Sequence, residues 1–132
     1  MKQRTTQNLA RGRFGERAAA RYLRRRFYRI LERNWFFYHK EIDIIARRGD
    51  LLVICEVKTR SRDEDSPYGP ASRAVDTPKQ RNLLIAAKGY ATKIGWTKSI
   101  RMDVIEVYLS QKPNKKRPAV KKIVHIKNAF TA

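Results

Sequence analysis

Two apolar segments separated by a short turn sequence constrain the fold of this chain more than any other feature. Residues 42–46 and 51–57 are rich in isoleucine, valine and leucine, a composition typical of β-strands. Between them lie Arg47-Arg48-Gly49-Asp50, and a glycine at the first central position suits a tight hairpin turn. The two segments therefore predict a β-hairpin.

Residues before the hairpin predict one helix and one strand. Apolar side chains recur at the helical period through residues 13–27, and we expect the core-facing stripe to consist of Ala19, Ala20, Leu23 and Phe27. Residues 28–37 are rich in aromatic and β-branched side chains, which favour a strand. A helix and a strand should therefore precede the hairpin.

Residues after the hairpin predict a loop, a helix and two strands. Pro67, Gly69 and Pro70 indicate an irregular loop at residues 60–74. Thr77 and Pro78 are typical of a helix start and Gly95 of a helix end, with an apolar face formed by Leu83, Leu84, Ala87, Tyr90 and Ala91. Residues 100–109 and 121–127 predict strands joined by the basic loop 111–120.

The resulting order is α, β, β, β, α, β, β, which predicts an α/β fold with a mixed central sheet flanked by helices. The chain has 132 residues, the usual size of one compact unit. We therefore expect a single domain spanning residues 1–132.

Polar residues interrupt the two apolar hairpin segments. If Gly49 and Asp50 form a two-residue loop, strand pairing places Asp43 across from Glu56 and Glu41 across from Lys58. A loop centred on residues 48–49 would instead pair Glu41 with Glu56 and still keep both carboxylates and Lys58 on one face. Only a one-residue slip would turn Asp43 to the opposite face.

Two facing carboxylates repel each other unless a cation lies between them. Magnesium prefers oxygen ligands and is usually held by one or two carboxylates with water and phosphate oxygens, so Asp43 and Glu56 predict a metal site beside Lys58. The alternative is a cross-strand ladder of ion pairs on a solvated face, in which Lys58 and Arg60 balance the acids.

Glu16 adds a third carboxylate. At 100° per residue it lies within about 40° of the apolar stripe of the first helix, and a buried acid requires a partner. The alternative is a favourable charge near a helix N-terminus, worth about 0.3–1 kcal/mol.

The charge balance indicates a polyanionic partner. Thirty-one Lys and Arg against twelve Asp and Glu leave a formal charge of +19. Self-repulsion on this scale is tolerated best when a polyanion neutralises it, so nucleic acid is the expected partner, the alternative being a surface that serves solubility alone. Neither a lipid anchor nor a basic amphipathic helix with bulky apolar residues stands out, so we expect no membrane partner.

Cysteine use and the N-terminal sequence indicate a cytoplasmic protein. Cys55 is the only cysteine and lies in an apolar run, which favours a buried reduced thiol. No apolar stretch follows the charged first residues, and no segment is long enough to span a bilayer.

At this point the sequence resembles the YraN-like proteins, small bacterial proteins placed by similarity in the PD-(D/E)XK nuclease superfamily near the archaeal Holliday-junction resolvases. Lys40 and Phe27 stand where that family usually has glycine. The ordered matches cover nearly the whole chain: Gly15-Glu16 with Ala18 and Ala19, Tyr28-Arg29-Ile30-Leu31, Arg33-Asn34-Trp35, Glu41-Ile42-Asp43, Glu56-Val57-Lys58-Thr59-Arg60, Tyr68-Gly69-Pro70, Ala74-Val75, Lys79-Gln80-Arg81 and Arg101-Met102-Asp103-Val104.

The resemblance implies a restriction-endonuclease-like core and a DNA endonuclease that uses magnesium or manganese, with branched DNA as a candidate substrate. It implies that Asp43 and Glu56 bind the metal, that Lys58 is the catalytic lysine and that Glu16 is the helical acid of the site. The nucleic-acid contacts it suggests are Arg60, Lys79, Gln80 and Arg81, and its resolvase relatives suggest a homodimer. Two alternatives stay open: a binding module that keeps the nuclease fold without cleaving, and an RNA- or ribosome-associated protein.

Overall fold

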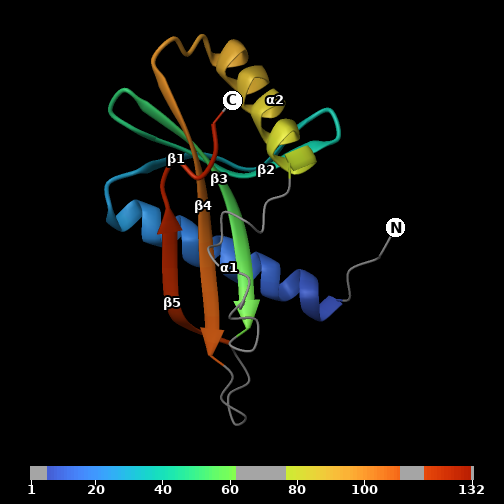
Figure 1. Ribbon diagram of the computed structural model, residues 1–132. Helices are drawn as coiled ribbons and strands as arrows, with labels where there is room; N and C mark the ends of the chain where they lie inside the picture. Colours follow the sequence, from blue (N-terminus) through green and yellow to red (C-terminus); the bar gives the residue numbers. More distant parts are fainter. Residues whose placement is uncertain (1–5, 62–76, 111–117, 132) are drawn as a thin grey trace.

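The computed structural model describes residues 6–61, 77–110 and 118–131, and its element order matches the predicted one (Figure 1). The fold is α/β, with a five-stranded mixed sheet and two helices, consistent with a restriction-endonuclease-like core. In chain order the elements are α1 (Thr6–Arg25), β1 (Arg29–Phe37), β2 (Lys40–Arg48), β3 (Leu51–Ser61), α2 (Thr77–Ile94), β4 (Ser99–Ser110) and β5 (Ala119–Ile126).

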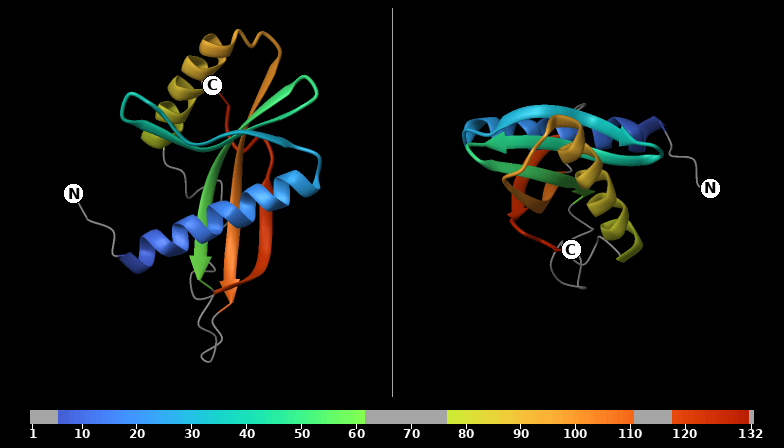
Figure 2. Two further views of the ribbon diagram at one scale, coloured as in Figure 1. Left: turned by 180° about the vertical axis from the view of Figure 1, so that it is seen from behind. Right: turned by 90° about the horizontal axis from the view of Figure 1, so that it is seen from above.

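The strands follow the chain order across the sheet, β1-β2-β3-β4-β5. Neighbouring strands are antiparallel except β3 and β4, which are parallel because α2 connects them in the chain. Figure 2 shows α1 crossing one face of the sheet, and α2 lies on the opposite face, over β1 and β2. The sheet therefore separates an α1 side from an α2 side.

The side chains of β3 alternate between two cores, as the sheet period requires. Leu52 and Ile54 pack with Leu83 and Tyr90 of α2. Val53, Cys55 and Val57 pack with Ala19 and Leu23 of α1. Cys55 is buried as predicted, and so is Val57, which leaves the intervening Glu56 facing the α2 side.

The central hairpin turns at the predicted two residues. Arg48 pairs with Leu51, so that Gly49 and Asp50 form the loop, and Gly49 has φ +59°, which a glycine adopts without steric cost. The backbone ladder runs from this turn to the pair Ile44 and Cys55. This is the first of the registers considered above, in which the side chains of Asp43 and Glu56 share a face.

Helix α1 differs from the prediction at both ends. It begins at Thr6 rather than near residue 13, because the segment before residue 13 lacks an apolar stripe but is otherwise compatible with a helix. It ends at Arg25, so the placement of Phe27 in the apolar stripe is wrong. Phe27 has φ +68° and an 87% exposed side chain, while the next residue, Tyr28, is buried.

The end of α1 is a Schellman motif. The amide of Tyr28 donates to the carbonyl of Leu23, and the amide of Phe27 donates to the carbonyl of Arg24. The left-handed residue of this motif is usually glycine, and here it is phenylalanine. At α2 the same motif is closed by Gly95, with φ +69°, as predicted.

Replacing this left-handed phenylalanine with glycine should stabilise the protein. Phe27→Gly removes the steric cost of φ +68° and loses almost no burial, so we expect the free energy of unfolding to rise by about 1 kcal/mol and Tm by about 3–5 °C. Thermal melts of both proteins measure the difference. Phe27→Ala, which keeps a Cβ atom, serves as the control and should not be stabilised.

A buried polar network ties β4 to β5. The Asp103 carboxylate accepts two hydrogen bonds from Arg101 at 2.8 Å each and one from the Asn128 amide at 3.0 Å, and His125 Nε2 lies 2.6 Å from its Oδ2. The hydroxyl of Tyr22 on α1 lies 3.2 Å from the other ring nitrogen of His125. Burial would raise the pKa of Asp103, but these hydrogen bonds outweigh it and hold the pKa below its usual value.

Parts of the predicted loops fall outside the described residues. These are residues 62–76 and 111–117, which include Pro67, Gly69 and Pro70. The assignment of Arg60 to the first loop is wrong, because β3 continues through Ser61. Within the described part of the chain, neither helix is long and apolar enough to cross a membrane.

Candidate active site

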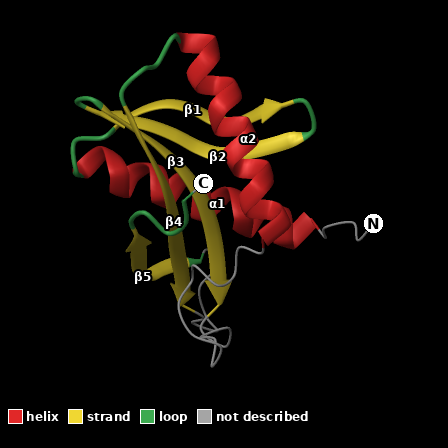
Figure 3. Ribbon diagram, turned by 45° about the horizontal axis from the view of Figure 1, so that its top comes forward, coloured by secondary structure: helices red, strands yellow, loops and turns green. Residues whose placement is uncertain are grey.

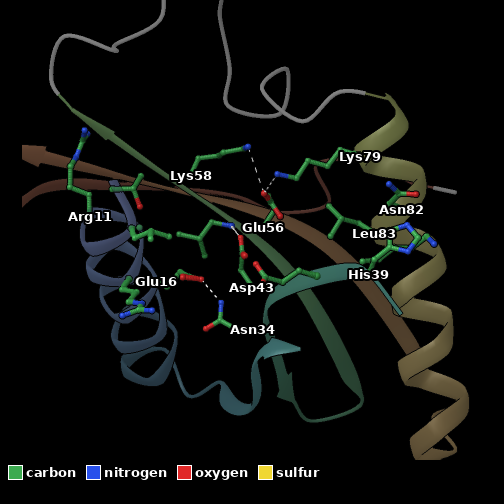
Figure 4. A pocket seen from close by; sticks show the side chains of 17 residues that line it. Arg11, Glu16, Asn34, His39, Asp43, Glu56, Lys58, Lys79, Asn82 and Leu83 are labelled. Carbon is green, nitrogen blue, oxygen red and sulfur yellow. Dashed lines mark hydrogen bonds and ion pairs between the residues drawn. The ribbon is translucent and has the colours of Figure 1, made fainter. Parts of the chain in front are cut away.

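A pocket of about 810 Å³ opens where α1, β2, β3 and the first turns of α2 meet (Figure 4). The four residues predicted to carry the chemistry all line it: Glu16 from α1, Asp43 from β2, and Glu56 and Lys58 from β3. Lys79 joins them from α2, and Figure 4 shows its side chain directed at Glu56. The structure therefore brings together residues that lie more than sixty positions apart in the chain.

Glu56 is the most enclosed acid of the pocket, with 5% of its side chain exposed. One carboxylate oxygen, Oε1, lies 2.5 Å from the Lys79 ammonium and 3.6 Å from the Lys58 ammonium. Two lysines thus share a single buried carboxylate. The sequence suggested Lys79 only as a nucleic-acid contact, because no local pattern shows that α2 will start beside β3.

Asp43 continues the link between β2 and β3 beyond the last backbone pair. Its Oδ2 accepts a hydrogen bond of 2.8 Å from the Val57 amide. Burial raises the pKa of Asp43 well above its usual value, and the nearby Glu56 carboxylate raises it further, while the Val57 amide opposes the rise. Asp43 is therefore an acid held in surroundings that disfavour its negative charge.

Glu16 reaches the pocket from the middle of α1. The side chain is half-buried rather than buried, and its Oε1 accepts a hydrogen bond of 2.6 Å from Asn34 Nδ2 on β1 in an exposed contact. The alternative reading as a helix N-terminal charge is wrong, because α1 starts at Thr6.

A glycine sets the distance between α1 and β3. A Cβ atom at Gly15 would overlap the Thr59 hydroxyl. Helix α1 can therefore lie against β3 only because residue 15 has no side chain, and this contact places the neighbouring Glu16 at the pocket.

The two lysines differ in how firmly they hold their protons. Burial lowers the pKa of Lys58, and the neighbouring Lys79 lowers it further. Burial would also lower the pKa of Lys79, but the Glu56 carboxylate outweighs it and the pKa rises. Lys79 is thus the firmly charged partner of Glu56, while Lys58 gives up its proton more easily than an ordinary lysine.

The oxygen donors of the pocket fit a magnesium or manganese ion that is only partly held by protein. In the described residues no group of three or more His, Cys, Asp or Glu side chains is placed to hold a metal ion, so a closed protein cage is absent from that part. Asp43 and Glu56 offer two carboxylates, the number usual for magnesium that keeps water and phosphate ligands. A cation there would also offset the Glu56 charge, which adds to burial in raising the pKa of Asp43.

The other predicted nucleic-acid contacts do not line this pocket. Arg60 Nε lies 2.5 Å from Glu106 Oε2, so its guanidinium is held by an acid of β4. Gln80 and Arg81 lie on the first turns of α2, and their role as nucleic-acid contacts stays a prediction.

The alternative of an ion-pair ladder on a solvated face describes the arrangement only in part. Lys58 does approach Glu56, but Glu56 is buried and Arg60 pairs with Glu106 rather than with an acid of β2.

The raised pKa of Asp43 predicts how stability depends on pH. A folded-state pKa above the unfolded value means that stability from this group is fully present below about pH 4 and is lost as pH rises through the folded pKa. Asp43→Asn keeps an oxygen acceptor for the Val57 amide and removes the charge. At pH 7 without metal we expect its Tm to exceed that of the parent by about 2 °C or more, with no excess near pH 4.

Thermal melts between pH 4 and 8 measure this excess. The control is Asp50→Asn, which removes an exposed aspartate whose nearest ion-pair distance, to Lys98, is 3.8 Å. Asp50 does not line the pocket, so Asp50→Asn should not reproduce the excess at pH 7. An Asp43→Asn protein that is less stable than the parent at pH 7 would contradict the expectation.

Comparison with known proteins places the chain in a family. The model of the family described as "Uncharacterised protein family UPF0102" matches residues 15–107, a range that contains all five pocket residues discussed above. A UPF0102 protein of Chlorobium chlorochromatii is 43% identical over 120 residues, covering 90% of this chain and 89% of the relative. A UPF0102 protein of Syntrophus aciditrophicus is 41% identical over 128 residues, covering 96% and 93%. One of Rhodococcus jostii is 37% identical over 125 residues, covering 93% and 98%. With a family model over most of its length and full-length relatives above one third identity, the chain belongs to the UPF0102 family, the YraN-like proteins that its motifs resemble.

Proposed function

We propose that this protein is a metal-dependent endonuclease that hydrolyses phosphodiester bonds in nucleic acid, with DNA as the principal substrate. The observation that carries the proposal is the concentration of acids in one pocket of a strongly basic chain. Glu16, Glu41, Asp43 and Glu56 all line it, four of the twelve acidic residues in a protein with a formal charge of +19. The same pocket is lined by five basic residues, Arg11, Arg13, Lys40, Lys58 and Lys79. Carboxylates that favour a bound cation therefore lie beside positive charges that favour a phosphate.

Asp43 and Glu56 would hold magnesium or manganese. When bound, such an ion polarises a phosphate and acidifies a water molecule. Lys58, whose pKa is lowered, would orient that water and offset developing negative charge. Lys79 supplies a fixed positive charge for a phosphate group, and Asn34 fixes the direction of the Glu16 carboxylate.

A second candidate is a nucleic-acid-binding module that does not cleave. The observation in its favour is that Lys58 and Lys79 already neutralise Glu56 without any metal ion. In that case the ion pairs of the pocket leave no place for a metal ion, and the positive charge of the chain alone binds nucleic acid. The two candidates differ in whether a divalent ion displaces Lys79 from Glu56.

The test is a cleavage assay with magnesium, manganese or a chelator on plasmid, linear duplex, branched DNA and RNA. We expect cleavage of DNA that requires the metal, together with metal binding detectable by calorimetry. DNA binding with neither cleavage nor metal binding would establish the second candidate, and a clear preference for RNA would favour an RNA-associated protein. The homodimer and the cytoplasmic location stay predictions.

A further inference from the structure

The tip of the β1–β2 hairpin carries exposed aromatic side chains. Phe37 pairs with Lys40, so Tyr38 and His39 form a two-residue turn, and Figure 3 shows this turn projecting beyond α2. The side chain of Tyr38 is 83% exposed and that of Phe36 is 55% exposed. Large aromatic rings in such a position are costly to leave in water without a partner.

The backbone at this turn is also unfavourable for tyrosine. Tyr38 has φ +56°, a left-handed conformation that glycine adopts freely and that clashes for a residue with a Cβ atom. Strain of this kind is concentrated at functional sites. Because its backbone is strained and its ring is exposed, Tyr38 contributes little to the stability of the free protein.

The turn is nevertheless fixed in place. The ring of Tyr38 meets that of Phe37 edge to face, with centroids 4.8 Å apart. Phe37 in turn lies against Gly89 of α2, where a Cβ atom would overlap its ring. The exposed ring is therefore supported by a half-buried neighbour that packs on α2.

The position of the turn links it to the pocket. His39, Lys40 and Glu41, which follow Tyr38 directly, all line the pocket that contains Asp43 and Glu56. Phe36 pairs with Glu41 across the hairpin. A nucleic-acid strand whose phosphate reaches the pocket would therefore bring its adjacent bases to these rings.

We propose that Tyr38 is a stacking surface for an unpaired nucleobase next to the phosphate held at the pocket. Aromatic side chains stack on single-stranded bases with little sequence preference, whereas paired bases inside a duplex offer no free face. The substrate class is then nucleic acid with an unpaired stretch at the bound site. This inference rests on the proposed function for its link to cleavage, but stacking itself does not require catalysis.

The experiment uses the full chain in chelator, so that no cleavage occurs. The probes are a single-stranded oligonucleotide and a blunt duplex, each with one 2-aminopurine, and both affinity and 2-aminopurine fluorescence are measured. We expect the parent to quench the single-stranded probe. Tyr38→Gly should lose about tenfold in affinity for the single strand and lose the quenching, with duplex affinity unchanged within about twofold. Tyr38→Phe should behave as the parent.

Phe27→Gly is the matched control. Phe27 also has a left-handed backbone conformation and an exposed aromatic ring, but it does not line the pocket. Both glycine variants relieve the same kind of backbone strain, and both should melt at or above the temperature of the parent. Only Tyr38→Gly should lose affinity for the single-stranded oligonucleotide. If Tyr38→Gly folds poorly, Tyr38→Asn replaces it, since asparagine tolerates the left-handed conformation.

Equal single-strand affinity and quenching in Tyr38→Gly and the parent, or equal losses in Tyr38→Gly and Phe27→Gly, would overturn the stacking surface. Metal-dependent cleavage of DNA by the parent is scored separately and tests the proposed function. A protein that cleaves but shows no Tyr38 effect refutes only this inference. A protein that does not cleave but shows the Tyr38 effect refutes only the nuclease and keeps the stacking surface.

Discussion

Glu56→Gln should reduce metal-dependent cleavage on the order of 10³-fold or more, the largest effect on activity that we expect from one substitution. Loss of a residue that hydrogen-bonds a metal ligand typically costs 10–100-fold. Under the proposed function Glu56 is itself one of two carboxylate ligands, so its loss should cost more. The amide is nearly the same size as the carboxylate, so the 5% exposed side chain still fits its site. Single-turnover cleavage at saturating DNA, with calorimetric titration of magnesium, measures both effects.

Glu106→Gln is the matched control for this substitution. Glu106 is an equally buried glutamate facing the same side of the sheet, it is held by Arg60, and it does not line the pocket. Both variants lose a buried ion pair and should lose stability, because each leaves cations without their anion. Only Glu56→Gln should lose cleavage, and unchanged cleavage in Glu56→Gln would remove the nuclease proposal.

Asp103→Asn should lower the free energy of unfolding by about 3 kcal/mol, the largest effect on stability that we expect. The Asp103 side chain is fully buried and holds together Arg101, His125 and the Asn128 amide. Removing one partner of a buried ion pair leaves the other uncompensated, which typically costs 3–5 kcal/mol, and the asparagine retains some of the hydrogen bonds. This is a large part of the 5–15 kcal/mol typical of a whole protein.

The pH dependence of this loss follows from the lowered pKa of Asp103. The stability that its charge contributes is fully present above the unfolded pKa of about 3.9 and is lost as pH falls through the lower folded value. The difference between parent and Asp103→Asn in urea unfolding should therefore shrink as pH falls below about 4. Cleavage below the melting temperature should not change, because Asp103 does not line the pocket. A difference under about 1 kcal/mol at pH 7 would contradict the role assigned to the network.

Local sequence patterns were sufficient to predict the β2–β3 hairpin and the shared face of Asp43, Glu56 and Lys58. Gly49 left two registers open, both of which keep the two carboxylates and Lys58 on one face, and the structure has the loop at residues 49–50. The alternation of β3 places Glu56 and Lys58 on one face and Val57 on the other. The order of elements followed from periodicity, strand-favouring composition, and the residues typical of turns and helix ends. These features depend on residues close together in the chain, which is why sequence reasoning could reach them.

The rest of the site depends on contacts that no local pattern encodes. The ion pair between Lys79 and Glu56 arises only when α2 packs beside β3, and the Asn34 partner of Glu16 arises only when α1 crosses β1. Phe27 was misplaced for a different reason. The helical period continued through it, but the buried Tyr28 closes the Schellman motif and turns Phe27 outward.

The overlap at Gly15 gives a steric criterion for judging relatives by sequence. A homologue can keep every charged residue of the pocket and still carry a larger side chain at the position of Gly15. Its first helix must then stand away from β3, because the Thr59 hydroxyl occupies the space that the added atom needs. The acid at the position of Glu16 would move away with the helix. The pocket would then contain all of its charged residues, but not in the arrangement described here. Under the proposed function, a relative with a larger side chain at this position should bind nucleic acid without cleaving it.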